Sequence, residues 1–138
     1  MFDKKNLPLD KIEILVGNFN LKNEIIKPFD ALIIDFLSRF SKELDKSKFT
    51  KSYKDLKTLS FFSRYQNLII LKKKFYTNQE VRVGQGLIFH VTPSNIPTNF
   101  AYSLIFGLLT GNSNIIKVTS KKFEQVSIIC KTLRKLLS

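Results

Sequence analysis

The sequence predicts an α/β fold in which an N-terminal helical region precedes a β-α-β-α unit. Through the first half of the chain, apolar residues recur at intervals of three and four, which is typical of helices that bury one face. The second half instead contains two short apolar runs on either side of an apolar segment of helix length. That order is typical of two parallel strands joined by a crossover helix. We expect the helical region to cover residues 1–78 and the second region to cover residues 79–138.

The helical region is expected to hold one short strand and two helices. Residues 11–16 (KIEILV) fit a short strand. Residues 28–44 fit a helix whose first turn contains Pro28, because the N–H group that proline lacks is not needed there. A second helix is predicted over residues 52–75, with a buried stripe formed by Tyr53, Leu56, Leu59, Phe62, Tyr65, Leu68, Ile69 and Phe75.

The β-α-β-α unit is expected to begin with a buried strand. Residues 80–83 alternate as a short strand would, and the Gly-Gln-Gly at residues 84–86 is expected to shape a tight entry into the next strand. Residues 87–91 form a continuous apolar and aromatic run, which is typical of a strand buried on both faces. Pro93 and Pro97 cannot continue this strand, since proline lacks the backbone donor.

A crossover helix, a second strand and a final helix complete the predicted unit. The helix over residues 98–110 is apolar on nearly all sides and is therefore expected to be buried. Gly111 ends it, because glycine tolerates the left-handed backbone found after helices. Residues 114–118 (NIIKV) form the next strand, and residues 121–137 form the last helix with Ser120 as its N-terminal cap.

The charge of the chain suggests an anionic partner, but its composition gives a simpler explanation. The sequence has 23 Lys and Arg against 11 Asp and Glu, a net charge of +12. Its only arginines are Arg39, Arg64, Arg82 and Arg134. Specific nucleic-acid readers rely on forked arginine contacts, and abundant Lys, Ile, Asn and Phe are expected from an AT-biased genome. We therefore expect no nucleic-acid partner, and a non-catalytic basic module that binds nucleic acid or another chain stays as the alternative.

The single cysteine and single histidine are not expected to form a reactive or metal-binding site. Cys130 lies on the apolar face of the last helix, where a thiol behaves as a small hydrophobe. His90 lies within the predicted buried strand, and neither residue has a partner at metal-ligand spacing. One cysteine excludes an intramolecular disulfide. No apolar run approaches the ~18 residues of a spanning helix, and no leader is evident, so a cytoplasmic protein without a membrane span is expected.

A nucleotide-sized crevice is predicted beyond the carboxyl ends of the two strands. In an open parallel sheet, ligands bind at that edge. The loop after the first strand carries Asn95, and Lys117 lies at the end of the second strand. The glycines at residues 84–86 do not form a dinucleotide fingerprint, because they precede the strand and Phe89 stands where a third glycine would fall.

The stretch GLIFHVTPSNIPTNFAYSLIFGLLTGNSNIIKVTS, residues 86–120, resembles the aldehyde dehydrogenase superfamily. Within it, the chain is most similar to the acyl-CoA (acyl-thioester) reductases, which include the fatty-acid reductase of bacterial bioluminescence. The paired signals are a PSN-P turn and a GN-x-N-x-x-K strand at this separation. The resemblance is strong over residues 82–137, weaker over residues 55–75, and limited to the general layout over the first fifty residues.

The resemblance implies specific roles at the crevice. Asn95 matches the asparagine whose side-chain amide stabilises the oxyanion formed when a cysteine thiolate attacks a carbonyl. Lys117 matches the lysine that reaches the adenosine ribose or its phosphate. Ser120 stands where many members have a ribose-binding glutamate, which tilts the cofactor toward NADPH, with NADH as the alternative. The nicotinamide-ribose side of the cofactor is matched by Thr92, Pro93 and Ser94.

Each of these residues also has a purely structural explanation. Asparagine often caps its own turn by bonding to nearby backbone, and Asn95 could do so. A lysine at a strand end commonly extends its amine into solvent, and Lys117 could do so.

The implied reaction is reduction of a fatty acyl thioester to an aldehyde through a cysteine thioester, with acyl-CoA or an acyl-protein as substrate. Residues 79–138 would be the first, incomplete part of a Rossmann-like NAD(P)-binding domain. In similar reductases the nucleophilic cysteine lies much later, so Cys130 is not expected to be it. We therefore expect the N-terminal part of a reductase that is inactive alone, with the remainder supplied as a second chain or a missing segment. A homo-oligomer is compatible with the complete enzyme, and a non-functional gene fragment is a further alternative.

Overall fold

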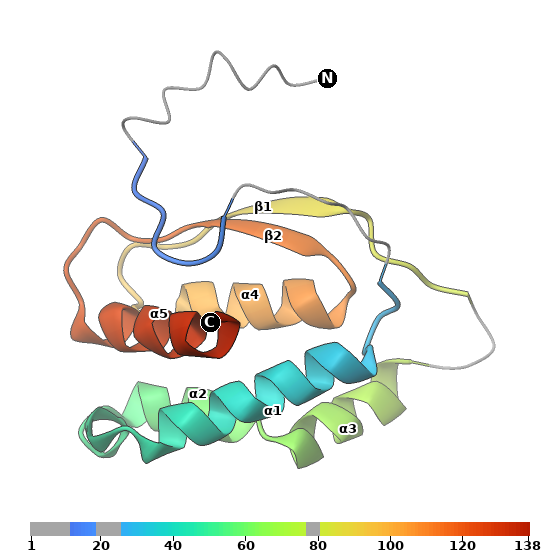
Figure 1. The fold of residues 1–138 in the computed structure, drawn as a ribbon, viewed down its shortest axis with the longest axis horizontal. Helices are drawn as coiled ribbons and strands as arrows, with labels where there is room; N and C mark the ends of the chain where they lie inside the picture. Colours follow the sequence, from blue (N-terminus) through green and yellow to red (C-terminus); the bar gives the residue numbers. More distant parts are fainter. Residues whose placement is uncertain (1–11, 19–25, 77–80) are drawn as a thin grey trace.

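The computed structural model describes residues 12–18, 26–76 and 81–138, and these residues form three layers (Figure 1). A two-stranded parallel sheet forms one outer layer, α4 and α5 form the middle, and α1, α2 and α3 form the other outer layer. The mixed α/β class with N-terminal helices is thus confirmed. The elements are α1 (Ala31–Lys46), a 3-10 helix (Lys48–Lys51), α2 (Lys54–Phe62), α3 (Tyr65–Phe75), β1 (Leu87–Val91), α4 (Asn99–Leu109), β2 (Ser113–Lys117) and α5 (Glu124–Leu137).

The predicted N-terminal strand does not form in the described residues, and the first helix begins later than predicted. Residues 12–16 are not in a strand, and Lys11, the first residue of the predicted strand, lies outside the described residues. Helix α1 begins at Ala31 because the Asp30 carboxylate accepts a hydrogen bond from the Leu32 amide at 2.8 Å and so caps the helix. Pro28 therefore belongs to the turn before α1 and not to its first turn.

The predicted single helix over residues 52–75 is wrong, because it is two helices broken at Ser63 and Arg64. The Ser63 hydroxyl donates to the Leu59 carbonyl at 2.9 Å, an i−4 bond that competes with the helical backbone pattern. Arg64 is extended, and the Asn67 amide donates to the Phe61 carbonyl at 2.6 Å across the break. This turn lets α2 and α3 pack separately against α1.

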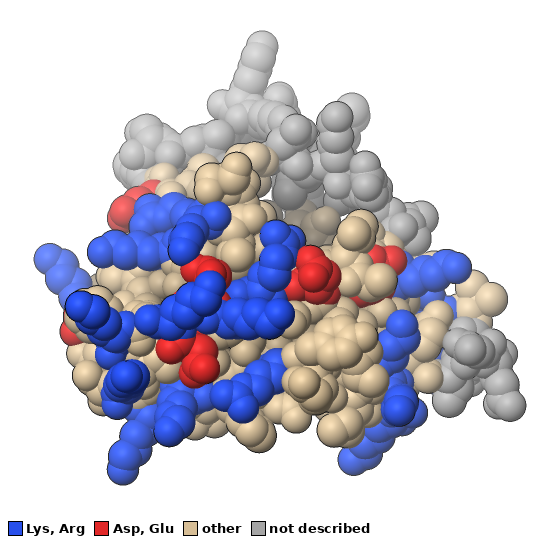
Figure 2. Space-filling view, turned by 60° about the horizontal axis from the view of Figure 1, so that its bottom comes forward, with Lys and Arg blue, Asp and Glu red and all other residues tan. Residues whose placement is uncertain are grey.

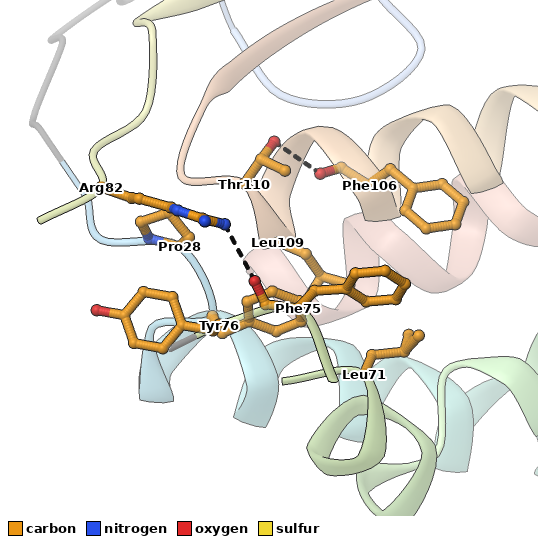
Figure 3. Close-up of a pocket in the computed structure, with 9 residues that line it drawn as sticks. Pro28, Leu71, Phe75, Tyr76, Arg82, Phe106, Leu109 and Thr110 are labelled. Atoms are coloured by element: carbon orange, nitrogen blue, oxygen red, sulfur yellow. Dashed lines mark hydrogen bonds between the residues drawn. The ribbon is translucent and has the colours of Figure 1, made fainter. Parts of the chain in front are cut away.

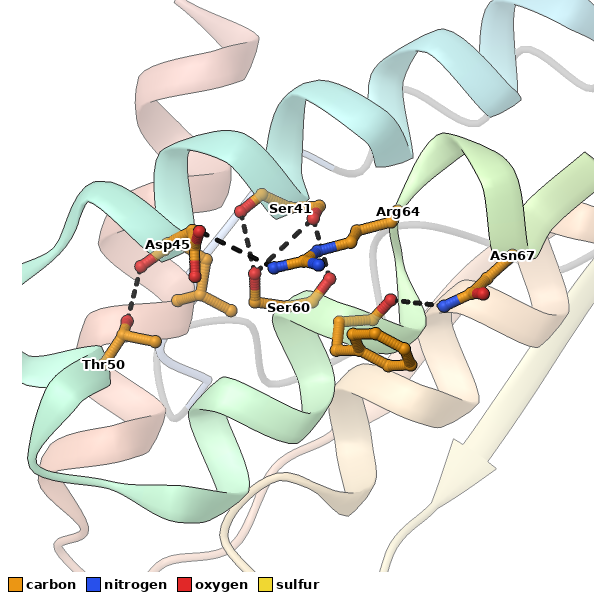
Figure 4. A network of polar contacts seen from close by, with 8 residues as sticks. Ser41, Asp45, Thr50, Ser60, Arg64 and Asn67 are labelled. Carbon is orange, nitrogen blue, oxygen red and sulfur yellow. Dashed lines mark hydrogen bonds and ion pairs between the residues drawn. The ribbon is translucent and has the colours of Figure 1, made fainter.

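The core lies between the helical layer and the α4–α5 layer. Leu56, Leu59 and Leu68 of the predicted stripe are fully buried, whereas Tyr65 and Phe75 are half-exposed. A buried polar contact joins α1 to α2: the two serine hydroxyls each donate to the other's backbone carbonyl, Ser41 at 2.7 Å and Ser60 at 3.1 Å (Figure 4). The other fully buried large side chains are Leu37, Phe40, Leu44, Ile105, Leu109 and Ile129.

The strands of the predicted β-α-β unit are confirmed as a parallel pair. Their register joins Leu87 to Ser113 and Val91 to Lys117. The predicted burial of the first strand on both faces is wrong: within the described part of the chain, α4 covers one face, while Phe89 and Val91 on the other are 62% and 69% exposed. Residues 81–83, where a strand was also predicted, are not in one, and Glu80 lies outside the described residues.

Glycines and asparagines pack the entry of β1 against the end of α4. A Cβ at Gly84 would lie 2.0 Å from the Gly111 carbonyl oxygen, so only glycine fits there. Gly86 (φ +108°) and Gly111 (φ +81°) have left-handed backbones, as the predicted turns require. The buried Asn112 side chain accepts hydrogen bonds from the Gln85 and Gly86 amides at 2.6 and 3.2 Å.

The last helix also begins later than predicted. Helix α5 starts at Glu124 after an extended Phe123, so Ser120 does not cap it. The Thr119 hydroxyl instead accepts a hydrogen bond from the Lys121 amide at 3.1 Å, which holds the loop between β2 and α5 in a local turn. Cys130 lies on the buried face of α5, as predicted.

Candidate functional site

Two hydrogen bonds tie together the loops that follow the two strands. The Thr92 hydroxyl donates to the Lys117 carbonyl at 3.0 Å, and the Thr119 hydroxyl donates to the Ser94 carbonyl at 3.3 Å. Because β1 and β2 are parallel neighbours, their carboxyl ends meet at one edge of the sheet. The structure therefore brings the loop with Thr92, Pro93, Ser94 and Asn95 next to the end of β2 and its following loop, which hold Lys117 and Ser120.

Asn95 lies in an exposed turn between Pro93 and Pro97. The described residues include the whole of this turn, and within them the Asn95 side chain makes no hydrogen bond. The alternative role, in which Asn95 caps this turn, therefore has no supporting contact. An exposed amide in a turn bounded by two prolines is available to a ligand.

Three exposed lysines lie in or next to the loop that follows β2, beside Asn95. The segment of residues 92–122 contains no Asp or Glu, and Lys117, Lys121 and Lys122 in it are exposed. Helix α4 also begins at this edge, and helix N-termini attract anions. Thr98, the residue before α4, is buried, and its side chain makes no capping bond within the described residues.

Lys117 and Ser120 are placed at the surface of this edge. Lys117 is the last residue of β2 and is exposed, while its backbone carbonyl is bonded to Thr92. Ser120 is exposed in the bend three residues later. Both side chains are exposed at this edge of the sheet, and their predicted cofactor roles stay predictions.

Positive charge is not confined to this edge. Figure 2 shows Lys and Arg spread over the helical face of the molecule, with acidic residues among them. Glu43 of α1 bonds both Lys46, at 2.7 Å, and Lys135 of α5. Hydrogen bonds from Lys135 and Lys46 lower the pKa of the Glu43 carboxyl to about 2. This interleaving is typical of a solvated surface, so charge alone selects no binding face.

The sequence did not reveal the roles of Thr119 and Asn114. Thr119 links the two loops, and the Asn114 side chain bonds His90 Nε2 at 2.9 Å and the Asn112 carbonyl at 2.7 Å. A Cβ at Gly107 would lie 1.9 Å from Asn114 Oδ1, so α4 packs closely on this amide. The asparagines of the GN-x-N motif are therefore structural. The sequence signal that could have indicated this role is the position of Asn112 and Asn114 directly after Gly111, which ends α4.

No reactive thiol lies at this edge of the sheet within the described residues. Cys130 is 4% exposed on α5, and burial raises the pKa of its thiol. A thiol that is buried and protonated is a poor nucleophile. No three His, Cys, Asp or Glu side chains in residues 12–18, 26–76 and 81–138 gather where they could hold a metal ion.

A family model described as acyl-CoA reductase (LuxC) matches residues 66–137, just over half of the chain. This chain belongs to the LuxC acyl-CoA reductase family. The match covers most of α3 and the whole β-α-β-α unit, including the loops that follow both strands. No curated protein and no solved structure matches the chain. Across the part of the chain that the structure describes, no helix has the length and apolarity needed to cross a membrane.

Proposed function

We propose that this chain supplies the oxyanion amide and the first half of the cofactor crevice of an NADPH-dependent acyl-CoA or acyl-thioester reductase. In this proposal Asn95 donates its side-chain amide to the oxygen that becomes negative when a thiolate attacks the acyl carbonyl. The acyl-accepting cysteine belongs to the remainder of the reductase, outside these 138 residues. The product is a long-chain aldehyde.

The observation that carries the proposal is the joining of the two loops beside Asn95. Thr92 and Thr119 lock the loops across the sheet edge, and Asn95 stays exposed and unbonded to its own turn. An oxyanion donor is most effective when it is held before the charge develops. Pro93 and Pro97 restrict the turn in that way.

The cofactor assignment rests on the charges around Ser120. When bound, a nicotinamide dinucleotide would supply the hydride. In this proposal Lys117 approaches its adenosine ribose, and the absence of a carboxylate from residues 92–122, which would repel a 2′-phosphate, supports the choice of NADPH. A Rossmann-like crevice with this charge favours NADPH over NADH.

A fusion protein tests both parts of the proposal. The 138-residue chain alone should show no thioester-dependent NADPH oxidation. Joined after Leu137 to the remaining sequence of a full-length LuxC-family reductase, it should show that activity. In the fusion, Ser120→Glu should shift the kcat/KM ratio of NADPH to NADH by about tenfold or more toward NADH, by repulsion of the 2′-phosphate. Ser127→Glu, an exposed change on α5, is the control. Thioester-dependent turnover by the unfused chain would refute the proposal that its nucleophile lies elsewhere.

A further inference from the structure

One segment of the helical layer carries most of the net positive charge of the chain. Residues 46–76 contain nine Lys and Arg residues and one acidic residue, Asp55, so they contribute eight of the twelve net positive charges. The Asp55 carboxylate is half-buried and accepts a hydrogen bond from Gln125 of α5 at 3.3 Å. A composition rich in lysine throughout the chain does not explain why acidic residues are nearly absent from this segment.

The solvent face of α2 exposes an aromatic ring beside its lysines. Lys54, Lys57 and Phe61 follow one another at intervals of three and four, so they share one face of the helix. Phe61 is 55% exposed, whereas the neighbouring Phe62 packs inward on aromatic rings of α4. The Arg64 guanidinium lies 5.1 Å from the centre of the Phe61 ring. More than half of the Phe61 surface is thus left to bury, and positive groups surround it.

The solvent face of α3 has the same composition. Ile70 is 61% exposed and lies one helical turn before the exposed Lys73 and Lys74. Leu71 and Phe75 instead line an apolar pocket of about 380 Å³ between the end of α3, the turn before α1 and the end of α4 (Figure 3). Ile70 is outside this pocket, so its apolar surface faces solvent and not an internal cavity.

These two faces form what we call the α2–α3 surface. Helices α2 and α3 both pack against α1 in the outer helical layer, and on this side of the molecule Lys and Arg side chains border uncharged areas (Figure 2). None of the four lysines on the two faces forms an ion pair with a residue that the structure describes. The surface consists of Lys54, Lys57, Phe61, Ile70, Lys73 and Lys74.

We propose that the α2–α3 surface docks on an anionic phospholipid bilayer. The lysine amines lie at the lipid phosphates, while Phe61 and Ile70 enter the boundary between headgroups and acyl chains. Lysine suits this position, because its aliphatic stem packs on apolar groups while its amine stays in water. Helices α2 and α3 have nine and eleven residues, too few to span a bilayer, so they lie on its surface.

A lipid surface fits these side chains better than a nucleic acid does. Readers of nucleic-acid sequence rely on arginine, and residues 46–76 contain only Arg64. An exposed isoleucine gains from an acyl-chain boundary and offers nothing to a phosphate backbone. The α2–α3 surface lies in the layer opposite the sheet, so its docking does not depend on the proposed reductase function.

Co-sedimentation of the 138-residue chain with phospholipid vesicles tests the role of charge. Phosphatidylcholine vesicles with about one-third phosphatidylglycerol should bind the chain at least tenfold more tightly than pure phosphatidylcholine, and added salt should weaken the binding. Lys57→Gln combined with Lys73→Gln should weaken it about tenfold or more, because both amines lie near the anionic surface. The control is Lys131→Gln combined with Arg134→Gln, which removes the same charge from the exposed face of α5 and should change binding less than about threefold.

A tryptophan reporter tests whether the apolar side chains enter the bilayer. The chain contains no Trp, so Phe61→Trp introduces a single indole, whose emission should move to shorter wavelength on anionic vesicles. Phe89→Trp, on the exposed outer face of the sheet, is the matched control and should keep its emission. Phe61→Ser combined with Ile70→Ser keeps every charge and should weaken vesicle binding about tenfold.

Several results would overturn the proposal. They are equal binding to neutral and anionic vesicles, equal losses for the two charge variants, and an emission shift at position 89 instead of position 61. Retention of the chain on DNA without binding to vesicles would also overturn it, and would identify nucleic acid as the partner of the basic segment.

Discussion

Replacement of Asn112 by alanine should destabilise the junction between the start of β1 and the end of α4. The Asn112 side chain is the acceptor for two backbone amides, those of Gln85 and Gly86, at the entry of β1. It also donates to the Thr110 hydroxyl at 2.8 Å, at the end of α4. One side chain therefore joins the start of β1 to the turn that starts β2.

The expected cost follows from the hydrogen bonds that would be lost. Each partly buried N–H left without a partner costs roughly 1–3 kcal/mol. Two such groups give an expected loss of about 2–6 kcal/mol for Asn112→Ala. For a chain of this size, that corresponds to a fall of about 7–20 °C in the unfolding midpoint.

Urea unfolding followed by circular dichroism measures this loss, with the m-value expected to stay the same. Asn67→Ala is the matched control. The Asn67 amide makes one hydrogen bond, to the Phe61 carbonyl, which also accepts from the Arg64 amide, so its loss should cost ~1 kcal/mol or less. If Asn112→Ala costs no more than Asn67→Ala, the proposed role of Asn112 at the junction is wrong.

Three further predictions concern packing, charge and the thiol. Gly84→Ala places a Cβ against the Gly111 carbonyl and should cost about 1–3 kcal/mol or more in urea unfolding; a loss no larger than that of Gly17→Ala, which meets no atom but strains a backbone with φ +78°, would count against the contact. Because the folded-state pKa of Glu43 is lowered to about 2 from 4.5, its ionised form stabilises the fold above about pH 4.5, and that contribution disappears as the pH falls toward 2. Glu43→Gln should therefore lower the urea midpoint at pH 6 and have little effect near pH 2, and an equal loss at both would be inconsistent with this pKa. Cys130 should react with a thiol reagent at least 10²-fold more slowly in the native chain than in urea, since burial shields it and raises its pKa; comparable rates would show an accessible thiol.

The β-α-β unit could be predicted to within a residue or so because its boundaries carry strong local signals. Pro93 and Pro97 end β1, and Gly111 ends α4. The break at Ser63 lacks such a signal. It depends on side-chain bonds to backbone, from Ser63 to Leu59 and from Asn67 to Phe61, which a hydrophobic period does not reveal.

The burial of β1 could not be predicted because it depends on what lies above the sheet. A continuous apolar run fits a strand covered on both faces, yet Phe89 stays mostly exposed in the described part of the chain. The meeting of the two crevice loops could be predicted, since parallel neighbours share an edge. The residue that helps hold the loops together, Thr119, could not, because its contact with Ser94 joins positions 25 apart in sequence.

We propose that the exposed Asn95 amide serves the reaction and not the fold. The most direct test of this proposal is kcat for thioester-dependent NADPH oxidation by the fused reductase, with Asn95→Ala compared with Asn99→Ala at the start of α4. Asn95→Ala should lower kcat by about 10²-fold or more with an unchanged urea midpoint, while Asn99→Ala should change kcat by less than about threefold. A loss of only about twofold for folded Asn95→Ala would contradict the claim.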